Sequence, residues 1–293
     1  MMRSEGKTVY KERFMEILLA DKAGFCFGVR RAIQTAFDAA SKGRVYCLGP
    51  LIHNPQEVER LRKAGVLTVS DISELSKGDS VIIRSHGVPP SVLAAAQENG
   101  LKVIDLTCPF VAKAQRHAES LRLEGYRVVV VGEKAHPEVQ SIVGYAGEGA
   151  VVIEAPKDIG PARLSGRIGV VAQTTQSYGN FSQIVLNLLR LSKELKVFNT
   201  ICNSTTERQA AARSLASHVD VMIVVGGRNS ANTTRLVTIC RQEGRTAHHI
   251  ETADEIVPEW LAGTERVGVA AGASTPDWII QDVLKRLREM SRC

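Results

Sequence analysis

Short apolar runs of strand length alternate along the chain with stretches in which apolar residues recur at helical spacing. Residues 128–131 and 221–225 are continuous apolar runs with the length of a buried strand. After Cys26 a helical pattern runs to Gly43, and its apolar face holds Val29, Ala32, Ile33, Ala36, Phe37 and Ala40. Strands that alternate with helices predict an α/β fold of parallel sheets with right-handed crossovers.

The same pattern occurs three times. An apolar run, a turn carrying a cysteine and a helical pattern are found in EILLADKAGFCFGVRRAIQTA, KVIDLTCPFVAKAQRHA and KVFNTICNSTTERQAAA. Each is followed at a similar interval by a second junction, in VYCLGPLIHNPQEVERL, VVVVGEKAHPEVQSI and VMIVVGGRNSANTTRL. A third junction follows in VIIRSHGVPPS, IGVVAQTTQS and VGVAAGASTPD. The chain therefore predicts three copies of one βα unit.

These repeats predict three small lobes and a variable N-terminal extension over residues 1–15. Residues 16–101 are expected to form lobe 1 with Cys26, and residues 102–195 lobe 2 with Cys108. Residues 196–293 are expected to form lobe 3 with Cys202 and a C-terminal helix. The predicted architecture is thus three pseudo-symmetric parallel-sheet lobes.

Unusual polar residues gather at the ends of the predicted strands. Ligands of parallel sheets bind beyond the carboxyl ends of the strands, so lobes packed around a pseudo-threefold axis would bring these residues together. The three repeated cysteines would then meet at one centre. The polar residues at the other junctions are His53, Asn54, His86, His136, Glu138, Thr174, Thr175, Asn229, Ser230, Asn232 and Ser274.

Three convergent thiolates favour a soft metal or an iron-sulfur cluster over a hard ion. Structural zinc sites use closely spaced cysteine pairs and four ligands, and this sequence has neither arrangement. A cubane cluster with three protein ligands would keep one iron free for substrate. Cys47 has no counterpart in the other units, and Cys240 and Cys293 look like helix and tail residues, so none of the three is predicted to be a ligand.

Composition and charge limit the possible functions. The 293 residues are 44% hydrophobic, as in a globular protein, and no apolar run approaches the roughly 18 residues of a membrane span. The N-terminus lacks the apolar core of a signal peptide, so a cytoplasmic protein is expected, without a membrane role. Aromatic residues make up only 5% and no basic block occurs, which argues against nucleic-acid binding. The net charge of +6 suits a small anionic substrate or an acidic partner.

The motifs together resemble the 4-hydroxy-3-methylbut-2-enyl diphosphate reductase family, also called IspH or LytB. The resemblance extends in order from residue 16 to the last predicted helix. One position departs from it, because Ala231 stands where family members often carry a second serine. The motifs that carry the resemblance are GFCFGVRRAI, HNPQEV, RSHGVPP, DLTCPFV, HPEV, AQTT, NTIC with TTERQ, NSANT and GASTPD.

The resemblance implies a three-lobed α/β fold around a central [4Fe-4S] cluster held by Cys26, Cys108 and Cys202. It further implies a two-electron, two-proton reductive dehydroxylation that gives isopentenyl and dimethylallyl diphosphates, the last step of the non-mevalonate isoprenoid pathway. The substrate hydroxyl would bind at the open iron, near groups matching Glu138, Thr174, Thr175 and Thr205. Its diphosphate would lie among His53, His86, His136, Ser230, Asn232 and Ser274.

The chemistry of these residue types agrees with those roles, although structural alternatives exist for several of them. Imidazoles that can be protonated, hydroxyl donors and helix N-termini suit a diphosphate, and Glu138 with a pKa raised in a dry pocket would suit a proton donor. Glu138 could instead cap the following helix, and Ser230, Asn232 and Ser274 could also be caps. Arg208 and Gln209 open the helix after the third cysteine and could simply be solvated there, so they are kept as structural possibilities only.

Electrons would have to come from a partner, because the sequence has no flavin or nicotinamide fingerprint. GGRNSAN does not fit G-x-G-x-x-G, so an acidic ferredoxin or flavodoxin is expected to be the donor. Two other functions remain possible at this stage. A dehydratase of the aconitase kind would need no reductant, and an iron-sulfur sensor would have no affinity for prenyl diphosphates.

Overall fold

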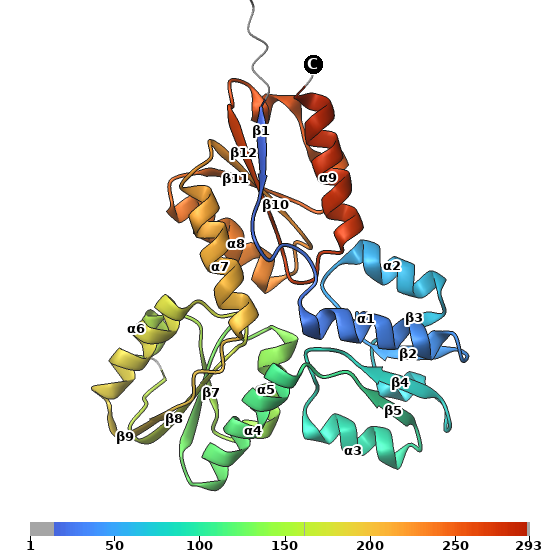
Figure 1. The fold of residues 1–293 in the computed structure, drawn as a ribbon. Coiled ribbons are helices and arrows are strands. Elements are labelled where there is room, and N and C mark those ends of the chain that lie inside the picture. The colour runs from blue at the N-terminus through green and yellow to red at the C-terminus, as the bar shows by residue number, and fades with distance from the viewer. Residues whose placement is uncertain (1–14, 161, 292–293) are drawn as a thin grey trace, which may run out of the picture.

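In the computed structural model, residues 15–160 and 162–291 are described. They form three parallel sheets of four strands each, and the sheets with their helices form three lobes around a common centre (Figure 1). The predicted α/β architecture of three parallel-sheet lobes is therefore confirmed. Most of the predicted N-terminal extension and Cys293 lie outside the described residues.

The first sheet has the strand order β3-β2-β4-β5, with all pairs parallel. Its strands are β2 (Val45–Leu48), β3 (Val66–Val69), β4 (Ser80–Ile83) and β5 (Lys102–Asp105), and the helices between Cys26 and β5 are α1 (Phe27–Ala40), α2 (Pro55–Lys63) and α3 (Pro90–Glu98).

The second sheet repeats this order as β7-β6-β8-β9. Its strands are β6 (Arg127–Val131), β7 (Val151–Ile153), β8 (Gly166–Ala172) and β9 (Ser192–Val197), and its helices are α4 (Pro109–Leu123), α5 (Pro137–Ala146) and α6 (Tyr178–Leu189).

The third sheet has the order β1-β12-β10-β11 and so joins the two ends of the described chain. Figure 1 shows β1, in blue, beside the red C-terminal elements. The strands are β1 (Glu16–Leu19), β10 (Val221–Val225), β11 (Thr246–Ile250) and β12 (Arg266–Ala271), and the helices are α7 (Asn203–Ala216), α8 (Ala231–Gln242) and α9 (Asp277–Met290).

Each strand that leads into a repeated cysteine pairs with the sheet of the preceding unit. β5 precedes Cys108 and lies at the edge of the first sheet, and β9 precedes Cys202 and lies at the edge of the second. β1 precedes Cys26 and takes the equivalent edge of the third sheet. The lobe boundaries expected at 101/102 and 195/196 stay predictions, but the sheets show that successive units share strands in a cyclic order.

The central strands are buried on both faces, which explains their continuous apolar sequences. In β10, Ile223 and Val225 pack on the side of α9, whereas Met222 and Val224 pack against α7 and α8. The two faces of β6 likewise contribute to two different clusters. Parallel sheets covered by helices on both sides are expected to have such strands. No helix within residues 15–160 and 162–291 combines the length and apolar character needed to cross a membrane.

Candidate active site

A cavity at the centre of the three lobes is lined by every residue that the sequence assigned to the site. It also contains residues that the sequence analysis did not single out, among them Ser85, Phe110 and Ser204. The predicted residues on its wall are Cys26, His53, His86, Cys108, His136, Glu138, Thr174, Thr175, Cys202, Thr205, Ser230, Asn232 and Ser274. The cyclic arrangement of the units thus brings distant strand ends to one place.

Each cysteine on this wall stands immediately before a helix. Cys26, Cys108 and Cys202 are the N-cap residues of α1, α4 and α7, and none of their side chains makes a capping hydrogen bond. Their thiols therefore lie beside the first turns of three helices, at the positive ends of the helix dipoles. Negative charge on sulfur is favoured at such positions.

One backbone hydrogen bond recurs at all three cysteines. The N–H of Cys108 donates to the carbonyl of Ser85 over 2.9 Å, and the N–H of Cys202 donates to that of Thr174 over 3.0 Å. The N–H of Cys26 donates in the same way to the carbonyl of Ala273 over 3.1 Å. The three acceptors directly precede His86, Thr175 and Ser274, so each thiol loop is fixed against a predicted substrate-binding loop.

The thiols influence one another electrostatically. Burial raises the pKa of the Cys108 thiol, and the nearby Cys26 and Cys202 raise it further, whereas the N–H groups of Phe110 and Val111 lower it. Burial also raises the pKa of the Cys202 thiol, whereas the nearby N–H groups of Ser204 and Thr205 lower it. Ionising all three thiols at once is unfavourable in this arrangement, unless a positively charged group binds between them.

Gly28 allows the sulfur of Cys108 to approach the helix that begins at Cys26. A Cβ atom built on Gly28 would lie only 2.8 Å from Cys108 Sγ. The glycine therefore keeps space between two of the three thiol loops.

We expect Gly28→Ala to bind iron less well than the natural chain without unfolding. The added methyl group would displace the Cys108 sulfur, while alanine favours helix over glycine by about 1 kcal/mol. Changes to residues that position a metal ligand typically cost about 10- to 100-fold in metal affinity. Iron and sulfide per chain after anaerobic reconstitution, with thermal melting of the apo-protein, measure the two effects. Gly179→Ala in α6 is the control because nothing lies within 4 Å of its added Cβ; equal iron content in both variants would contradict the expectation.

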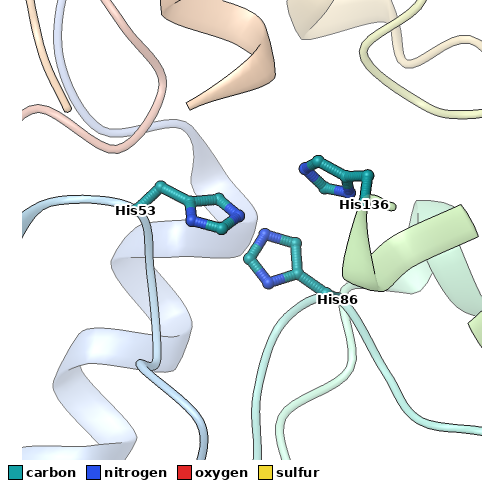
Figure 2. A group of neighbouring side chains, drawn as sticks. All are labelled: His53, His86 and His136. Atoms are coloured by element: carbon teal, nitrogen blue, oxygen red, sulfur yellow. The ribbon is translucent and has the colours of Figure 1, made fainter. Parts of the chain in front are cut away.

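Three histidines face one another on the wall of the cavity (Figure 2). The ring centroids of His53 and His86 are 4.5 Å apart, and each lies 5.3 Å from that of His136. One ring nitrogen from each lies within 4.8 Å of the others, so the three can contact a single ligand. Such a group suits either a metal ion or the oxygens of an anion.

The pKa values of these imidazoles are low enough to keep them neutral near neutral pH. Burial, aided by the nearby charge of Arg84, lowers the pKa of His53 to about 4. Burial, His53 and Arg84 lower the pKa of His136 to about 4 as well. Burial lowers the pKa of His86 well below its usual range, and the other two histidines and Arg84 add to the effect. The sequence analysis did not single out Arg84, whose positive charge favours an anion over a metal cation at this place.

Glycine provides space for the Arg84 side chain. Gly49 has a φ of +73°, and a Cβ atom at this position would lie 2.7 Å from Arg84 Nη1. The Nε atom of Arg84 is buried without a hydrogen-bond partner among the described residues. A fixed cation therefore lies close to the three histidines.

Several polar atoms of the cavity residues are buried without partners in the described part of the chain. They are His53 Nε2, His86 Nδ1, Thr175 Oγ1 and both amide atoms of Asn232. Buried polar groups in native proteins are nearly always hydrogen-bonded, so these groups indicate a polar ligand of the cavity.

Glu138 lies 2% exposed and interacts with Thr174 rather than with its own helix. Its Oε1 accepts from the Thr174 N–H over 2.6 Å, and its Oε2 accepts from Thr174 Oγ1 over 2.9 Å. Burial raises the pKa of Glu138 to about 7, with a smaller contribution from Glu133, against the two bonds from Thr174. The carboxyl group can therefore be protonated near neutral pH, and the Thr174 hydroxyl can accept or donate that proton.

Of the residues that could have been helix caps, Ser230 is one, whereas Glu138, Asn232 and Ser274 are not. The cap of α5 is His136, whose Nδ1 accepts from the Glu138 N–H over 3.2 Å, so Glu138 is not the cap. Ser230 does cap α8 by accepting from the Thr233 N–H, and it lines the cavity as well. Asn232 lies within α8 and makes no cap, and Ser274 Oγ donates to the His53 carbonyl over 3.2 Å.

Arg208 and Gln209 are buried, so the possibility that they are solvated at the start of the helix does not hold. They are 4% and 9% exposed and lie on the inner face of α7 with Thr205, Ala212 and Ala216. The helical spacing of Thr205, Arg208, Gln209 and Ala212 was the signal for this face. Because Arg208 is charged and Thr205 and Gln209 are polar, this face of the helix was not recognised as buried.

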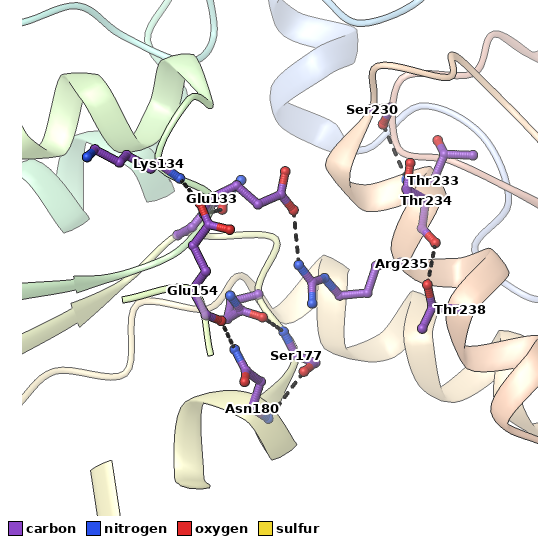
Figure 3. A network of polar contacts seen from close by, with 12 residues as sticks. Glu133, Lys134, Glu154, Ser177, Asn180, Ser230, Thr233, Thr234, Arg235 and Thr238 are labelled. Carbon is purple, nitrogen blue, oxygen red and sulfur yellow. Dashed lines mark hydrogen bonds and ion pairs between the residues drawn. The ribbon is translucent and has the colours of Figure 1, made fainter. Parts of the chain in front are cut away.

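Two further side-chain contacts join the lobes close to the cavity. Arg235 of α8 donates to Glu133, which follows β6, over 3.1 Å (Figure 3). Trp278 Nε1 of α9 donates to Glu57 of α2 over 3.1 Å. The third lobe is thus hydrogen-bonded to both of the others around the site.

Comparisons with known proteins point to one family. The LytB protein family matches residues 17–288. A curated 4-hydroxy-3-methylbut-2-enyl diphosphate reductase of a Geobacter species is 50% identical over 279 residues, which are 95% of this chain and 99% of that protein. The protein of the same name from Aquifex aeolicus is 50% identical over 282 residues, covering 94% of this chain and 97% of the relative.

Two solved structures are similar to this one. A structure of (E)-4-hydroxy-3-methyl-but-2-enyl diphosphate reductase, described as the terminal enzyme of the non-mevalonate pathway, is 49% identical with a TM-score of 0.68. It is matched over 94% of this chain and 99% of that chain. The E-1-hydroxy-2-methyl-but-2-enyl-4-diphosphate reductase from Plasmodium falciparum is 26% identical with a TM-score of 0.88, over 92% of this chain and 87% of that chain.

Proposed function

The chain belongs to the LytB family, and from this membership we propose that it reduces 4-hydroxy-3-methylbut-2-enyl diphosphate to isopentenyl and dimethylallyl diphosphates. The curated relatives that have the name of this reductase match this chain over nearly their whole length. The reaction would complete the non-mevalonate pathway, as stated for the related solved structure.

Cys26, Cys108 and Cys202 would hold a [4Fe-4S] cluster in the cavity. Three thiols at helix N-termini suit a group with positive metal centres, and Gly28 keeps space beside one of them. When bound, such a cluster supplies electrons and a Lewis-acidic iron site for removal of the allylic hydroxyl. Among the described residues, the group of ligand atoms close enough together for one metal ion is that of the three histidines and not that of the three thiols.

His53, His86 and His136 would bind the diphosphate together with Ser230, Asn232 and Ser274. The free ring nitrogens and the unpartnered amide of Asn232 offer hydrogen bonds to phosphate oxygens. The N-terminus of α8 contributes its positive dipole at Ser230. Because their low pKa values keep His53 and His136 neutral near neutral pH, Arg84 provides the fixed positive charge at this place.

Glu138 would hold the proton that leaves with the hydroxyl as water. Its position beside Thr174 and Thr175 on the cavity wall, and its pKa near neutrality, support this role. Thr174 Oγ1 is hydrogen-bonded to the carboxyl group of Glu138 and can relay its proton. Thr205 lies on the same cavity wall, near Cys202. The closed surroundings of Glu138 exclude bulk water from the proton.

The observation that carries the proposal is the convergence of three thiols, three histidines and Glu138 on one cavity. The test is to purify the chain without oxygen, measure iron and sulfide, and assay reduction of the hydroxylated C5 diphosphate. We expect turnover only when an electron donor of the ferredoxin or flavodoxin class, or a chemical reductant, is present. Turnover without reductant would instead indicate a dehydratase, and cluster binding without affinity for the diphosphate would indicate a sensor.

We expect pyrophosphate, used as a probe of the diphosphate site, to bind with uptake of protons near pH 6.5. An anion raises the pKa of neighbouring imidazoles from about 4 toward the working pH, so up to about one proton per histidine can be bound. Calorimetry in buffers of different ionisation enthalpy measures this uptake. His136→Asn should take up fewer protons, whereas the exposed control His218→Gln should match the natural chain. Equal uptake in all three proteins would contradict the expectation.

A further inference from the structure

Arg208 is a buried cation whose hydrogen bonds go to the backbone around Cys26. Its Nη1 donates to the carbonyl of Ala271 over 3.2 Å and also to the carbonyl of Lys22. The side chain extends from α7, the helix that begins at Cys202. One guanidinium therefore connects the helix of one thiol with the segments that hold another.

Both acceptors belong to segments that position Cys26. Lys22 lies in the turn between β1 and Cys26, with a φ of +63° that non-glycine residues seldom adopt. Ala271 ends β12, and two residues later Ala273 accepts the hydrogen bond from the Cys26 N–H. The hydrogen bonds of Arg208 thus fix the turn before Cys26 against the strand that also anchors this cysteine.

The positive charge of Arg208 has no carboxylate partner within residues 15–160 and 162–291. Among the described residues no ion pair includes Arg208, and its Nε atom is buried without a partner. The adjacent Glu207 is directed outward to Lys22, and both side chains are more than half exposed, at 56% and 64%. Burial lowers the pKa of Arg208, and the charges that oppose this are Cys26 and Cys202 first, then Glu207. A buried charge is costly unless it is compensated, so the two thiolates are its natural counter-charge.

We propose that Arg208 is a positioning residue of the iron-sulfur cluster, holding the Cys26 turn against the Cys202 helix and stabilising negative charge on the cluster and its thiolates. This inference rests on the proposed function, since it requires a cluster at Cys26, Cys108 and Cys202. Reduction adds an electron to a group that already carries thiolate charge, and a nearby fixed cation favours the reduced state. Arg208 therefore raises the reduction potential and slows the loss of iron.

The experiment compares the natural chain with Arg208→Gln, Arg208→Lys and Arg213→Gln, all reconstituted without oxygen. Arg213 lies on the same helix but is 54% exposed and pairs with Glu243, so its replacement is a matched control for charge. The readouts are iron and sulfide per chain, the rate of iron loss to a chelator, and the midpoint potential followed by electron paramagnetic resonance during titration with dithionite.

We expect Arg208→Gln to disfavour one-electron reduction by about tenfold, which corresponds to about 59 mV for a one-electron couple. Arg208→Lys should keep the potential of the natural chain but lose iron faster, and Arg213→Gln should change neither property. The inference is overturned if Arg208→Gln behaves like the control, or if the lysine and glutamine variants lower the potential equally.

Thermal melting of the apo-proteins shows whether each variant folds, independently of its iron loss and midpoint potential. If Arg208→Gln does not fold, Arg208→Lys decides, because faster iron loss at an unchanged potential supports the inference and a normal rate of loss overturns it. A failure of the proposed function looks different, because the natural chain itself would then bind no iron and sulfide.

Discussion

Glu138→Gln is expected to lower turnover by about 10²- to 10⁴-fold while iron content and diphosphate binding stay unchanged. Glutamine has the shape of glutamate and can still interact with Thr174, but its amide cannot supply the proton that Glu138 holds at a pKa of about 7. Because the acid form is the active one, turnover of the natural chain should fall as the pH rises through about 7. Removing the carboxyl group should remove this pH dependence.

Steady-state assays from pH 6 to 9, with iron analysis of each sample, measure both effects. Glu148→Gln is a suitable control because Glu148 is exposed just beyond the end of α5. It makes the same chemical change without touching the cavity. Turnover of Glu138→Gln close to that of this control would remove Glu138 from the mechanism, whatever its pKa.

Cys108→Ser is expected to abolish reductive turnover by loss of the cluster. The serine hydroxyl is a poor ligand for iron in such clusters, and changes beyond the ligands themselves already cost about 10- to 100-fold in metal affinity. The loss of a ligand should therefore exceed that range. Iron and sulfide analysis, visible absorption of the cluster and the reductant-dependent assay measure the result.

Cys47→Ser is the matched control for this experiment. Cys47 is 1% exposed in β2 and belongs to the apolar core of the first sheet, where burial raises the pKa of its thiol to about 12. Its replacement should destabilise the protein by placing a hydroxyl in the core, but the chain should keep its cluster. Equal loss of iron in both variants would indicate that general instability, and not ligation, explains the result for Cys108.

The sequence was sufficient to predict the three sheets because each unit repeats a local pattern. Strand length, helical spacing and the position of the polar residues are properties of short segments, and they placed the cysteines and histidines at strand ends. Parallel topology then brings those ends together. The residues meet at one cavity, as expected from their positions at the strand ends. The roles of the individual residues stay proposals.

Features that depend on distant partners could not be predicted in this way. The pairing of β1 with β12 joins segments from opposite ends of the chain, and no local pattern specifies it. The neutral state of the histidines depends on burial and on Arg84, whose position beside Gly49 is set by tertiary packing. The burial of Arg208 likewise depends on carbonyls far away in the sequence, at Lys22 and Ala271.

The pairing of β1 with β12 has a consequence for biosynthesis. The loops of Cys108 and Cys202 are anchored to segments that leave the ribosome before them, at Ser85 and Thr174. The loop of Cys26 is anchored to β12 and Ala273, which are translated near the end. A nascent chain that has not reached β12 can place two of its thiols but not the third. We therefore expect the three thiols to come together only after β12 has been translated, and a premature stop before β12 would give a product in which the loop of Cys26 lacks its anchor.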